Sequence, residues 1–258
     1  MGVTEIDNVL MILGVSLTMN ELERKVITKE MMRGFNDKAI QAGTIVTGGQ
    51  SVMNPWPTIG GTAISVVNKN KVKYPNNAKA GHKLILTKPL GTRICVNLAQ
   101  WFIEKRVNWE KSKEYITESE MWESYYLAEE SMSRLNINAA KLMGKYNVGA
   151  CTDITGFGIK GHCENLVNAQ KENLKFVINI LPVFPKMDLI NNNVFNFKLF
   201  EGYSAETSGG LLIAIDKDEA ENYISELLEL GEKSWIIGEV IEGNREVEIT
   251  SDFKFIYA

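Results

Sequence analysis

The stretch ACTDITGFGIKGH, residues 150–162, places the carboxylate of Asp153 among threonines and glycines, between an apolar run and an amphipathic segment. Glycine lets the backbone approach a ligand closely, and the N-terminus of a following helix offers N–H groups and a positive dipole to phosphate. A carboxylate here suits a phosphate-bound Mg²⁺, which prefers hard oxygen ligands. Alternatively, the glycines only serve a tight connection from strand to helix. The local pattern leaves both interpretations open.

The composition excludes several classes of protein. The 28 basic and 32 acidic residues give a formal charge of −4 with no basic block, so we expect neither nucleic acid nor membrane as a partner. The longest apolar run, residues 9–13, is far shorter than the ~20 residues that span a bilayer, and the N-terminus lacks the pattern of a signal peptide. The unpaired Cys95, Cys151 and Cys163 fit a reducing compartment. We therefore predict a soluble, cytoplasmic protein.

The first part of the chain predicts strands around one helix. Residues 6–15 form an apolar run typical of a buried strand, and a chain that starts inside such a pattern is expected to be truncated. Asn20 is a suitable helix N-cap, and apolar residues at helical spacing continue up to Gly43. The other predicted elements are a strand at residues 44–47, a turn at 48–51, a rigid corner at 55–57, a strand at 59–67 and a linker at 68–77.

The remainder mixes strands and helices without strict alternation, which predicts an α+β fold. We predict two domains, residues 1–75 and 80–258, and interpret residues 181–202 as a polar surface excursion. The predicted strands are residues 83–87, 151–154, 174–180, 211–215, 235–240 and 247–249, of which the last two form a closing pair. The predicted helices are residues 94–101, one long helix within 112–147, 161–170 and 218–230.

Three glycine-rich turns follow or precede short apolar strands, at residues 48–50, 155–158 and 207–210. Each sets hydroxyl or amide side chains beside bare backbone. Three such turns in one chain indicate a surface that receives a polyanion, such as a nucleoside triphosphate. None of them matches the GxxxxGK[ST] phosphate loop or the dinucleotide GxGxxG motif.

The search for a nucleophile gives no candidate. The cysteines lie among apolar residues or on a predicted helix, which is typical of inert core thiols. His82 and His162 have no partners for a zinc site or a Ser/His/Asp triad, and His162, at a helix start, is expected to make a structural hydrogen bond. Lys88 could neutralise phosphate, but we interpret it as an ordinary surface lysine.

Five segments occur in one order along the chain: GGQSVMNPW at residues 48–56, LTKPLGT at 86–92, TDITGFG at 152–158, ETSGGLL at 206–212 and WIIG at 235–238. Together they resemble the eukaryotic type of the selenophosphate synthetase (selenide, water dikinase) family. The resemblance covers nearly the whole chain. Similar glycine-rich ATP sites recur in the related aminoimidazole ribonucleotide synthetase-like superfamily, but the Asn-Pro-Trp and Trp-Ile-Ile-Gly segments favour this member.

The resemblance implies a two-domain PurM-like α+β fold and a homodimer whose N-terminal strands build a shared barrel. It implies synthesis of selenophosphate, AMP and phosphate from ATP, selenide and water, a kinase-type transferase reaction that serves selenocysteine biosynthesis. It assigns one Mg²⁺ ligand and six ATP-binding residues: Asp153 for the metal, and Gly48, Gly49, Gln50, Ser51, Thr155 and Gly156 for ATP.

The chain departs from the family pattern at its N-terminus. The family's reactive Cys or selenocysteine, its partner Lys and further Mg²⁺-binding aspartates lie upstream of the segment that matches this chain, so no catalytic residue is assigned here. The hypothesis is a truncated form that is inactive alone, because phosphoryl transfer depends on positioning and charge neutralisation. Alternatives are a non-catalytic nucleotide-binding partner subunit, or a related phosphotransferase with another acceptor.

Overall fold

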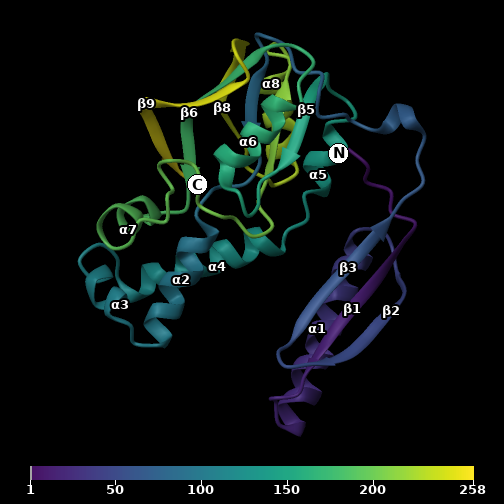
Figure 1. Cartoon of the computed structure of the whole chain (residues 1–258), viewed down its shortest axis with the longest axis vertical. Helices are drawn as coiled ribbons and strands as arrows, with labels where there is room; N and C mark the ends of the chain where they lie inside the picture. Colours follow the sequence, from purple (N-terminus) through teal and green to yellow (C-terminus); the bar gives the residue numbers. More distant parts are fainter. Residues whose placement is uncertain (1) are drawn as a thin grey trace. The chain divides into compact units, whose positions relative to one another are not determined.

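The computed structural model describes residues 2–258, which form two compact units, Gly2–Val72 and Lys73–Ala258. Figure 1 shows the elements of each unit, and each unit is described by itself below. No helix within residues 2–258 is long and apolar enough to span a bilayer.

The first unit is a three-stranded sheet with one long helix. Strand β1 lies at the centre, parallel to β2 and antiparallel to β3, in the order β2-β1-β3. The predicted N-cap is confirmed, because the Asn20 side chain accepts the N–H of Glu23 while the Glu23 side chain accepts that of Asn20. The elements are β1 (Asn8–Ser16), α1 (Glu21–Gln41), β2 (Val46–Asn54), β3 (Thr58–Ile64) and the short 3₁₀ turn η1 (Lys69–Lys71).

The predicted turn at residues 48–51 is wrong, because these residues lie inside β2. Glycine is required there by close strand pairing. A Cβ on Gly49 would lie 1.8 Å from the Met11 carbonyl oxygen of β1, and the φ of Gly49 is +141°. Successive strand residues point to opposite faces of a sheet, so the side chains of Gln50 and Ser51 diverge.

One face of this sheet carries apolar side chains that residues 2–258 leave exposed. Leu10 and Ile12 of β1 alternate with the buried Val9 and Leu13, and Ile12 is 56% exposed. On the buried face, the Phe35 ring of α1 lies so close over β3 that the ring would clash with a Cβ on Gly61. The sheet is therefore covered by α1 on one face and open on the other.

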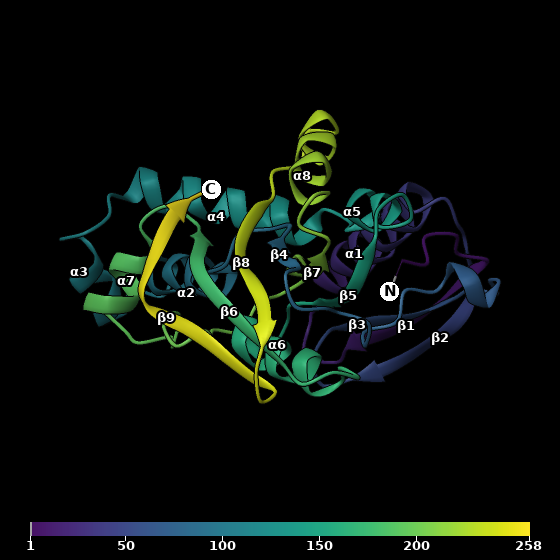
Figure 2. The same ribbon diagram turned by 90° about the horizontal axis from the view of Figure 1, so that it is seen from above.

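The second unit is a six-stranded sheet with helices on both faces. Its strand order is β5-β7-β4-β8-β6-β9, which Figure 2 shows from one edge to the other. Neighbours pair antiparallel except β6 and β9, which are parallel. The strands are β4 (Lys83–Leu86), β5 (Val148–Asp153), β6 (Leu174–Val183), β7 (Leu211–Ile215), β8 (Trp235–Glu242) and β9 (Glu246–Tyr257). The helices are α2 (Thr92–Ile103), α3 (Val107–Ser112), α4 (Glu118–Ser133), α5 (Ile137–Leu142), α6 (Gly158–Asn168), α7 (Met187–Asn193) and α8 (Ala220–Glu229).

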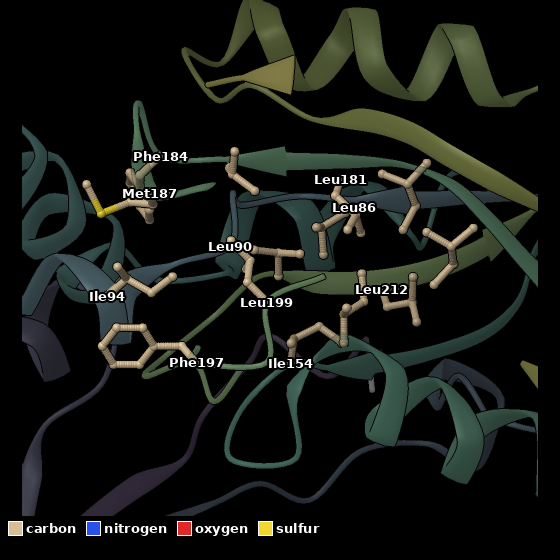
Figure 3. Close-up of a cluster of buried hydrophobic side chains, with 14 of the residues drawn as sticks. Leu86, Leu90, Ile94, Ile154, Leu181, Phe184, Met187, Phe197, Leu199 and Leu212 are labelled. Carbon is tan, nitrogen blue, oxygen red and sulfur yellow. The ribbon is translucent and has the colours of Figure 1, made fainter. Parts of the chain in front are cut away.

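Alternation along the strands divides the core of the second unit into two layers. Leu84 and Leu86 of β4 belong to a cluster with α2 and α6, whereas Ile85 between them belongs to a cluster with α5 and α8. Figure 3 shows part of the first cluster, in which Leu86 and Leu212 come from strands and Ile94 from α2. The sheet is therefore buried on both faces.

Three sequence predictions fail in this unit. The helix predicted within residues 112–147 is broken into α4 and α5, because Arg134 is extended and its carbonyl accepts the Lys88 ammonium. The segment 181–202 is largely packed rather than a surface excursion, since most of its apolar residues are buried and Asn191 accepts two backbone N–H groups inside it. Strands β8 and β9 do not pair with each other, because β6 lies between them.

Candidate functional site

The loop between β5 and α6 carries Asp153, Thr155 and Gly156. Asp153 is the last residue of β5 and is half-buried, whereas Gly156 and Phe157 are exposed. The Asp153 carboxylate makes no hydrogen bond or ion pair with any of residues 2–258. A Cβ on Gly156 would meet no atom within 4 Å. The protein itself therefore does not require glycine there, which fits close approach of a ligand to the backbone.

His162 fixes this loop from within α6. Its Nε2 accepts the backbone N–H of Thr155 at 3.0 Å and lies 3.1 Å from the Thr155 hydroxyl. Burial lowers the pKa of His162, against the opposing charge of Asp153. Because Nε2 accepts a backbone N–H, the imidazole is neutral with its proton on Nδ1. The predicted structural hydrogen bond is confirmed.

The N-terminus of α6 offers less to an anion than the sequence suggested. The Gly158 N–H donates to the Thr155 carbonyl at 3.0 Å, and the Lys160 N–H donates to the Gly202 carbonyl at 2.8 Å. A helix binds phosphate through N–H groups that have no other acceptor. The expectation of a phosphate site on the helix itself is therefore weakened, and the loop before the helix becomes the stronger candidate.

The loops after β4, after β5 and before β7 meet at one edge of the six-stranded sheet. The Ile154 N–H donates to the Gly210 carbonyl at 2.9 Å, and the Glu206 N–H donates to the Thr155 carbonyl at 3.0 Å. Because β5 and β7 are antiparallel neighbours, the end of one strand lies beside the start of the other. The glycine-rich segments at residues 153–158 and 206–210 therefore form one surface.

Glu206 joins this surface to the loop after β4. Its buried carboxylate accepts the backbone N–H of Gly91 at 2.7 Å, the N–H of Thr92 at 2.9 Å and the Thr92 hydroxyl. Burial raises the pKa of Glu206 to about 7, against the lowering effect of these hydrogen bonds. A carboxylate at the start of α2 also complements the helix dipole. Glu206 therefore holds the loop before β7 against the loop after β4 through hydrogen bonds.

The interpretation of Lys88 as a surface lysine is wrong, because its side chain is 1% exposed. Its ammonium donates to the Arg134 carbonyl at 2.7 Å and to the Ser208 carbonyl at 2.8 Å. A buried ammonium needs such acceptors, since desolvation of an unpaired charge is costly. Lys88 therefore anchors the turn before β7 from beneath.

The three cysteines are confirmed as inert core residues. All are buried, and burial raises the pKa of each thiol, to about 12 for Cys151. A thiol with such a pKa carries almost no thiolate at neutral pH, and the thiolate is the nucleophile.

The donor set at Asp153 fits a Mg²⁺ ion as one ligand among several. Mg²⁺ is held by one or two carboxylates together with substrate phosphates and water. Within residues 2–258 no group of three or more His, Cys, Asp or Glu side chains could hold a metal ion. The unbonded Asp153 carboxylate supplies an oxygen of the kind that such an ion prefers.

Comparison with known proteins places the chain in a family. Residues 79–250 match the family model described as AIR synthase related protein, C-terminal domain. The chain is 45% identical to Selenide, water dikinase 2 of Mus musculus over 253 residues, which cover 96% of this chain and 56% of the mouse protein. It is 44% identical to Selenide, water dikinase of Trypanosoma brucei brucei over 262 residues, which cover 99% and 67%. The chain belongs to the selenide, water dikinase family.

Solved structures agree with the predicted fold class of this dikinase-family chain. Escherichia coli HypE, a hydrogenase maturation protein, aligns with a TM-score of 0.69 at 17% identity over 95% of this chain and 70% of that chain. Thiamine Monophosphate Kinase from Aquifex aeolicus aligns with a TM-score of 0.64 at 15% identity over 97% and 75%. At such identities the likeness shows the fold alone, and it confirms the PurM-like α+β fold. The chain spans little more than half of its mouse relative's length.

Two functional candidates escaped the sequence analysis of this dikinase-family chain. The sequence presents Glu206 only as part of a motif and predicts Lys88 at the surface. Lys88 follows the last residue of β4 after a single residue, Thr87, so it is still close to the core strands. No local signal marks the partner carbonyls of Lys88, which lie 46 and 120 residues away in the chain.

Proposed function

We propose that this chain takes part in ATP-dependent synthesis of selenophosphate from selenide, with AMP and phosphate as the other products. Family membership supports the reaction, and the edge where Asp153, Thr155 and Gly156 meet the turn before β7 supports an ATP phosphate site. Another solved relative in fold, HypE, is described in complex with ATP.

In this proposal each residue has a limited task. The Asp153 carboxylate holds a Mg²⁺ ion, which neutralises phosphate charge when bound. Gly156 lets phosphate oxygens approach the backbone, since no side chain fills that space. His162 keeps the Thr155 backbone in place through its Nε2. On the family resemblance, we also propose four residues of β2 as ATP contacts: Gly48, Gly49, Gln50 and Ser51.

The test is calorimetric titration of Mg²⁺–ATP into the 1–258 chain, together with ³¹P NMR of a mixture with ATP and selenide. Turnover to AMP and selenophosphate supports the full reaction. Binding of Mg²⁺–ATP without turnover supports a nucleotide-binding partner subunit instead. Absence of any Mg²⁺–ATP binding contradicts both functions.

The metal role of Asp153 is tested by Asp153→Asn and Asp153→Ala. We expect Mg²⁺-dependent ATP binding to weaken about tenfold or more, as loss of a charge-assisted contact predicts, with little loss of stability. Asp252→Asn, at an exposed position of β9, is the control and should bind as the unchanged chain does. If the Asp153 variants unfold instead, Asp153 is a structural residue and the metal assignment is wrong.

We also propose a homodimer formed through the open face of the first unit's sheet. Ile12 and Val52 lie on this face and are 56% and 46% exposed, and both outer strands are exposed along their length. Exposed strand edges and apolar faces are normally covered. Light scattering should show a dimer that Ile12→Glu dissociates. Val66→Glu, at an exposed position outside the sheet, should leave it intact.

The proposed location is the cytoplasm, and we propose no nucleic-acid or membrane partner. All three cysteines are free, as is usual in a reducing compartment. The formal charge of −4 gives no electrostatic attraction to nucleic acid or to an anionic lipid surface.

A further inference from the structure

In the turn before β7, residues 207–210, the Thr207 N–H donates to the Thr92 hydroxyl at 3.2 Å, whereas the last three residues have bonded carbonyls and N–H groups that are unbonded within residues 2–258. The Ser208 carbonyl accepts from the Lys88 ammonium at 2.8 Å, the Gly209 carbonyl from Asn136 Nδ2 at 2.9 Å and the Gly210 carbonyl from the Ile154 N–H at 2.9 Å. The backbone N–H groups of Ser208, Gly209 and Gly210 have no acceptor among residues 2–258. Backbone donors are normally paired, so three consecutive unpaired N–H groups call for an acceptor.

The carbonyl partners also strengthen these donors. Each carbonyl shares a peptide unit with the N–H of the following residue, so a hydrogen bond to the carbonyl polarises that N–H. The Lys88 ammonium polarises the N–H of Gly209 in this way, and Asn136 polarises that of Gly210. Successive N–H groups in a turn with a left-handed residue form an anion-binding concavity, and Ser208 has a φ of +49°.

Steric contacts exclude any side chain at the two glycines of the turn. A Cβ on Gly209 would lie 2.3 Å from the Ile154 carbonyl oxygen, and a Cβ on Gly210 would lie 2.4 Å from the backbone nitrogen of Lys88. Both glycines are therefore needed for the packing of the turn itself. Thr207 and Ser208 are exposed, whereas Gly209 and Gly210 are buried, so the accessible groups of the turn include the two hydroxyls.

The local charges leave the turn receptive to an anion. Lys88 lies beneath it as a buried cation. The buried carboxylate of Glu206 accepts hydrogen bonds from Gly91 and Thr92 on the neighbouring loop. These hydrogen bonds stabilise the Glu206 carboxylate on the side of the neighbouring loop, and the carboxylate accepts nothing from the N–H groups of residues 208–210.

We propose that residues 207–210 form a phosphate-binding turn, in which the N–H groups of Ser208, Gly209 and Gly210 and the Ser208 hydroxyl bind a phosphoryl group beside Asp153. The inference rests on the proposed function for the identity of the ligand, ATP. The Glu206–Thr155 and Ile154–Gly210 hydrogen bonds join the turn to the segment that follows Asp153. The turn and Asp153 can therefore contact the same phosphate chain.

The direct test is amide NMR of the ¹⁵N-labelled 1–258 chain during separate titrations with Mg²⁺–ATP and with inorganic phosphate. We expect downfield shifts of the Ser208, Gly209 and Gly210 amide protons. Shifts with both ligands assign the turn to phosphate in general, and shifts with Mg²⁺–ATP alone assign it to the nucleotide; either result supports the proposal. Binding of Mg²⁺–ATP by calorimetry without shifts at these amides overturns it.

A variant gives an independent test by calorimetry. Ser208→Ala should weaken Mg²⁺–ATP binding about tenfold, as loss of one hydrogen bond to a charged group predicts, without lowering the melting temperature. Ser133→Ala removes an exposed serine hydroxyl at the end of α4 and should bind ATP normally. Unchanged affinity of Ser208→Ala contradicts the hydroxyl contact. If the unchanged chain binds no ATP, the proposed function fails first, and the phosphate titration still decides on the turn.

Discussion

The two units of this chain use helical apolar residues in opposite ways. In the first unit, α1 carries apolar residues at helical spacing, yet Ala39 is the one residue of the helix that is buried. Leu22 and Val26 are 71% and 50% exposed. In the second unit, α2 buries most of its apolar residues, and Leu98 is 0% exposed. Helical spacing of apolar residues therefore shows which residues can be buried, whereas packing by the rest of the chain determines whether they are.

The largest expected effect comes from removing matched leucines from these two helices. Leu98→Ala should lower the free energy of unfolding of the second unit by about 2–5 kcal/mol, because it leaves a cavity in a packed core. Leu22→Ala should change the stability of the first unit by less than about 0.5 kcal/mol, as at other exposed sites. Hydrogen exchange measured segment by segment separates the units. If Leu22→Ala instead lowered the free energy of unfolding of the first unit by more than about 2 kcal/mol, α1 would be covered in solution and the two helices would not differ in this way.

A buried carboxyl is a second property that separates the units. The buried polar residues of the first unit, Ser16 and Thr44, carry no charge, whereas the second unit buries Glu206. The pKa of Glu206 rises from its ordinary value of 4.5 to about 7 on folding. The folded state then binds the proton more tightly than the unfolded state. The stability that the Glu206 carboxyl contributes is therefore largest below pH 4.5, decreases as the pH rises towards 7, and stays constant above that.

Between pH 4.5 and 7 we expect the free energy of unfolding to fall by roughly 3 kcal/mol, and Glu206→Gln should abolish this fall. Urea unfolding at a series of pH values measures it. Glu120 is the control with the opposite sign, because its hydrogen bond with Lys186 holds its pKa at about 2. Its stabilising effect is present above its ordinary pKa and is lost as the pH falls towards 2, so Glu120→Gln should alter only the acid limb. A Glu206→Gln profile with the original slope between pH 4.5 and 7 would refute the assignment.

A third expected effect concerns glycines in the first unit. Gly49→Ala should destabilise this unit by about 1–3 kcal/mol, because the new Cβ would collide with the Met11 carbonyl at a φ of +141°. Gly60→Ala is the matched control in the neighbouring strand β3, where a Cβ meets no atom within 4 Å. It should be neutral or stabilising by about 0.5 kcal/mol. Circular dichroism melts of the two variants make the comparison, and equal melting temperatures would show that the strands separate freely at Gly49.

The failures of sequence analysis have the same cause as the contrast between the units. Strands such as β1 and β7 and the N-cap at Asn20 were predicted correctly, because their signals lie within a few residues. Gly49 was read as a turn residue, although its glycine is required by contact with Met11, a residue 38 positions away. Lys88 was read as exposed because its acceptors belong to distant loops. Long-range contacts leave no local pattern.

The candidate site follows the same division. One short motif identifies Asp153 and Gly156, and the structure places Asp153 at the half-buried end of β5 and Gly156 in the exposed loop that follows, where a Cβ would meet no atom within 4 Å. The sequence also marked residues 207–210 as a glycine turn. It could not show that, within residues 2–258, the carbonyls of Ser208, Gly209 and Gly210 are bonded while the N–H groups of these three residues are not, because that asymmetry depends on contacts with distant residues: Lys88, Asn136 and Ile154.

The smallest expected effect tests whether the contrast extends to local interactions. Asn20 caps α1, a helix that buries only Ala39, and Thr117 caps α4, a helix that buries several residues. Both caps are exposed, and each has a reciprocal glutamate. A capping hydrogen bond depends on atoms within one helical turn, so Asn20→Ala and Thr117→Ala should each cost about 1 kcal/mol. Hydrogen exchange in the first turn of each helix measures this. A much larger cost at Thr117 would show that packing amplifies the cap, and the two units would then differ even in their shortest-range interactions.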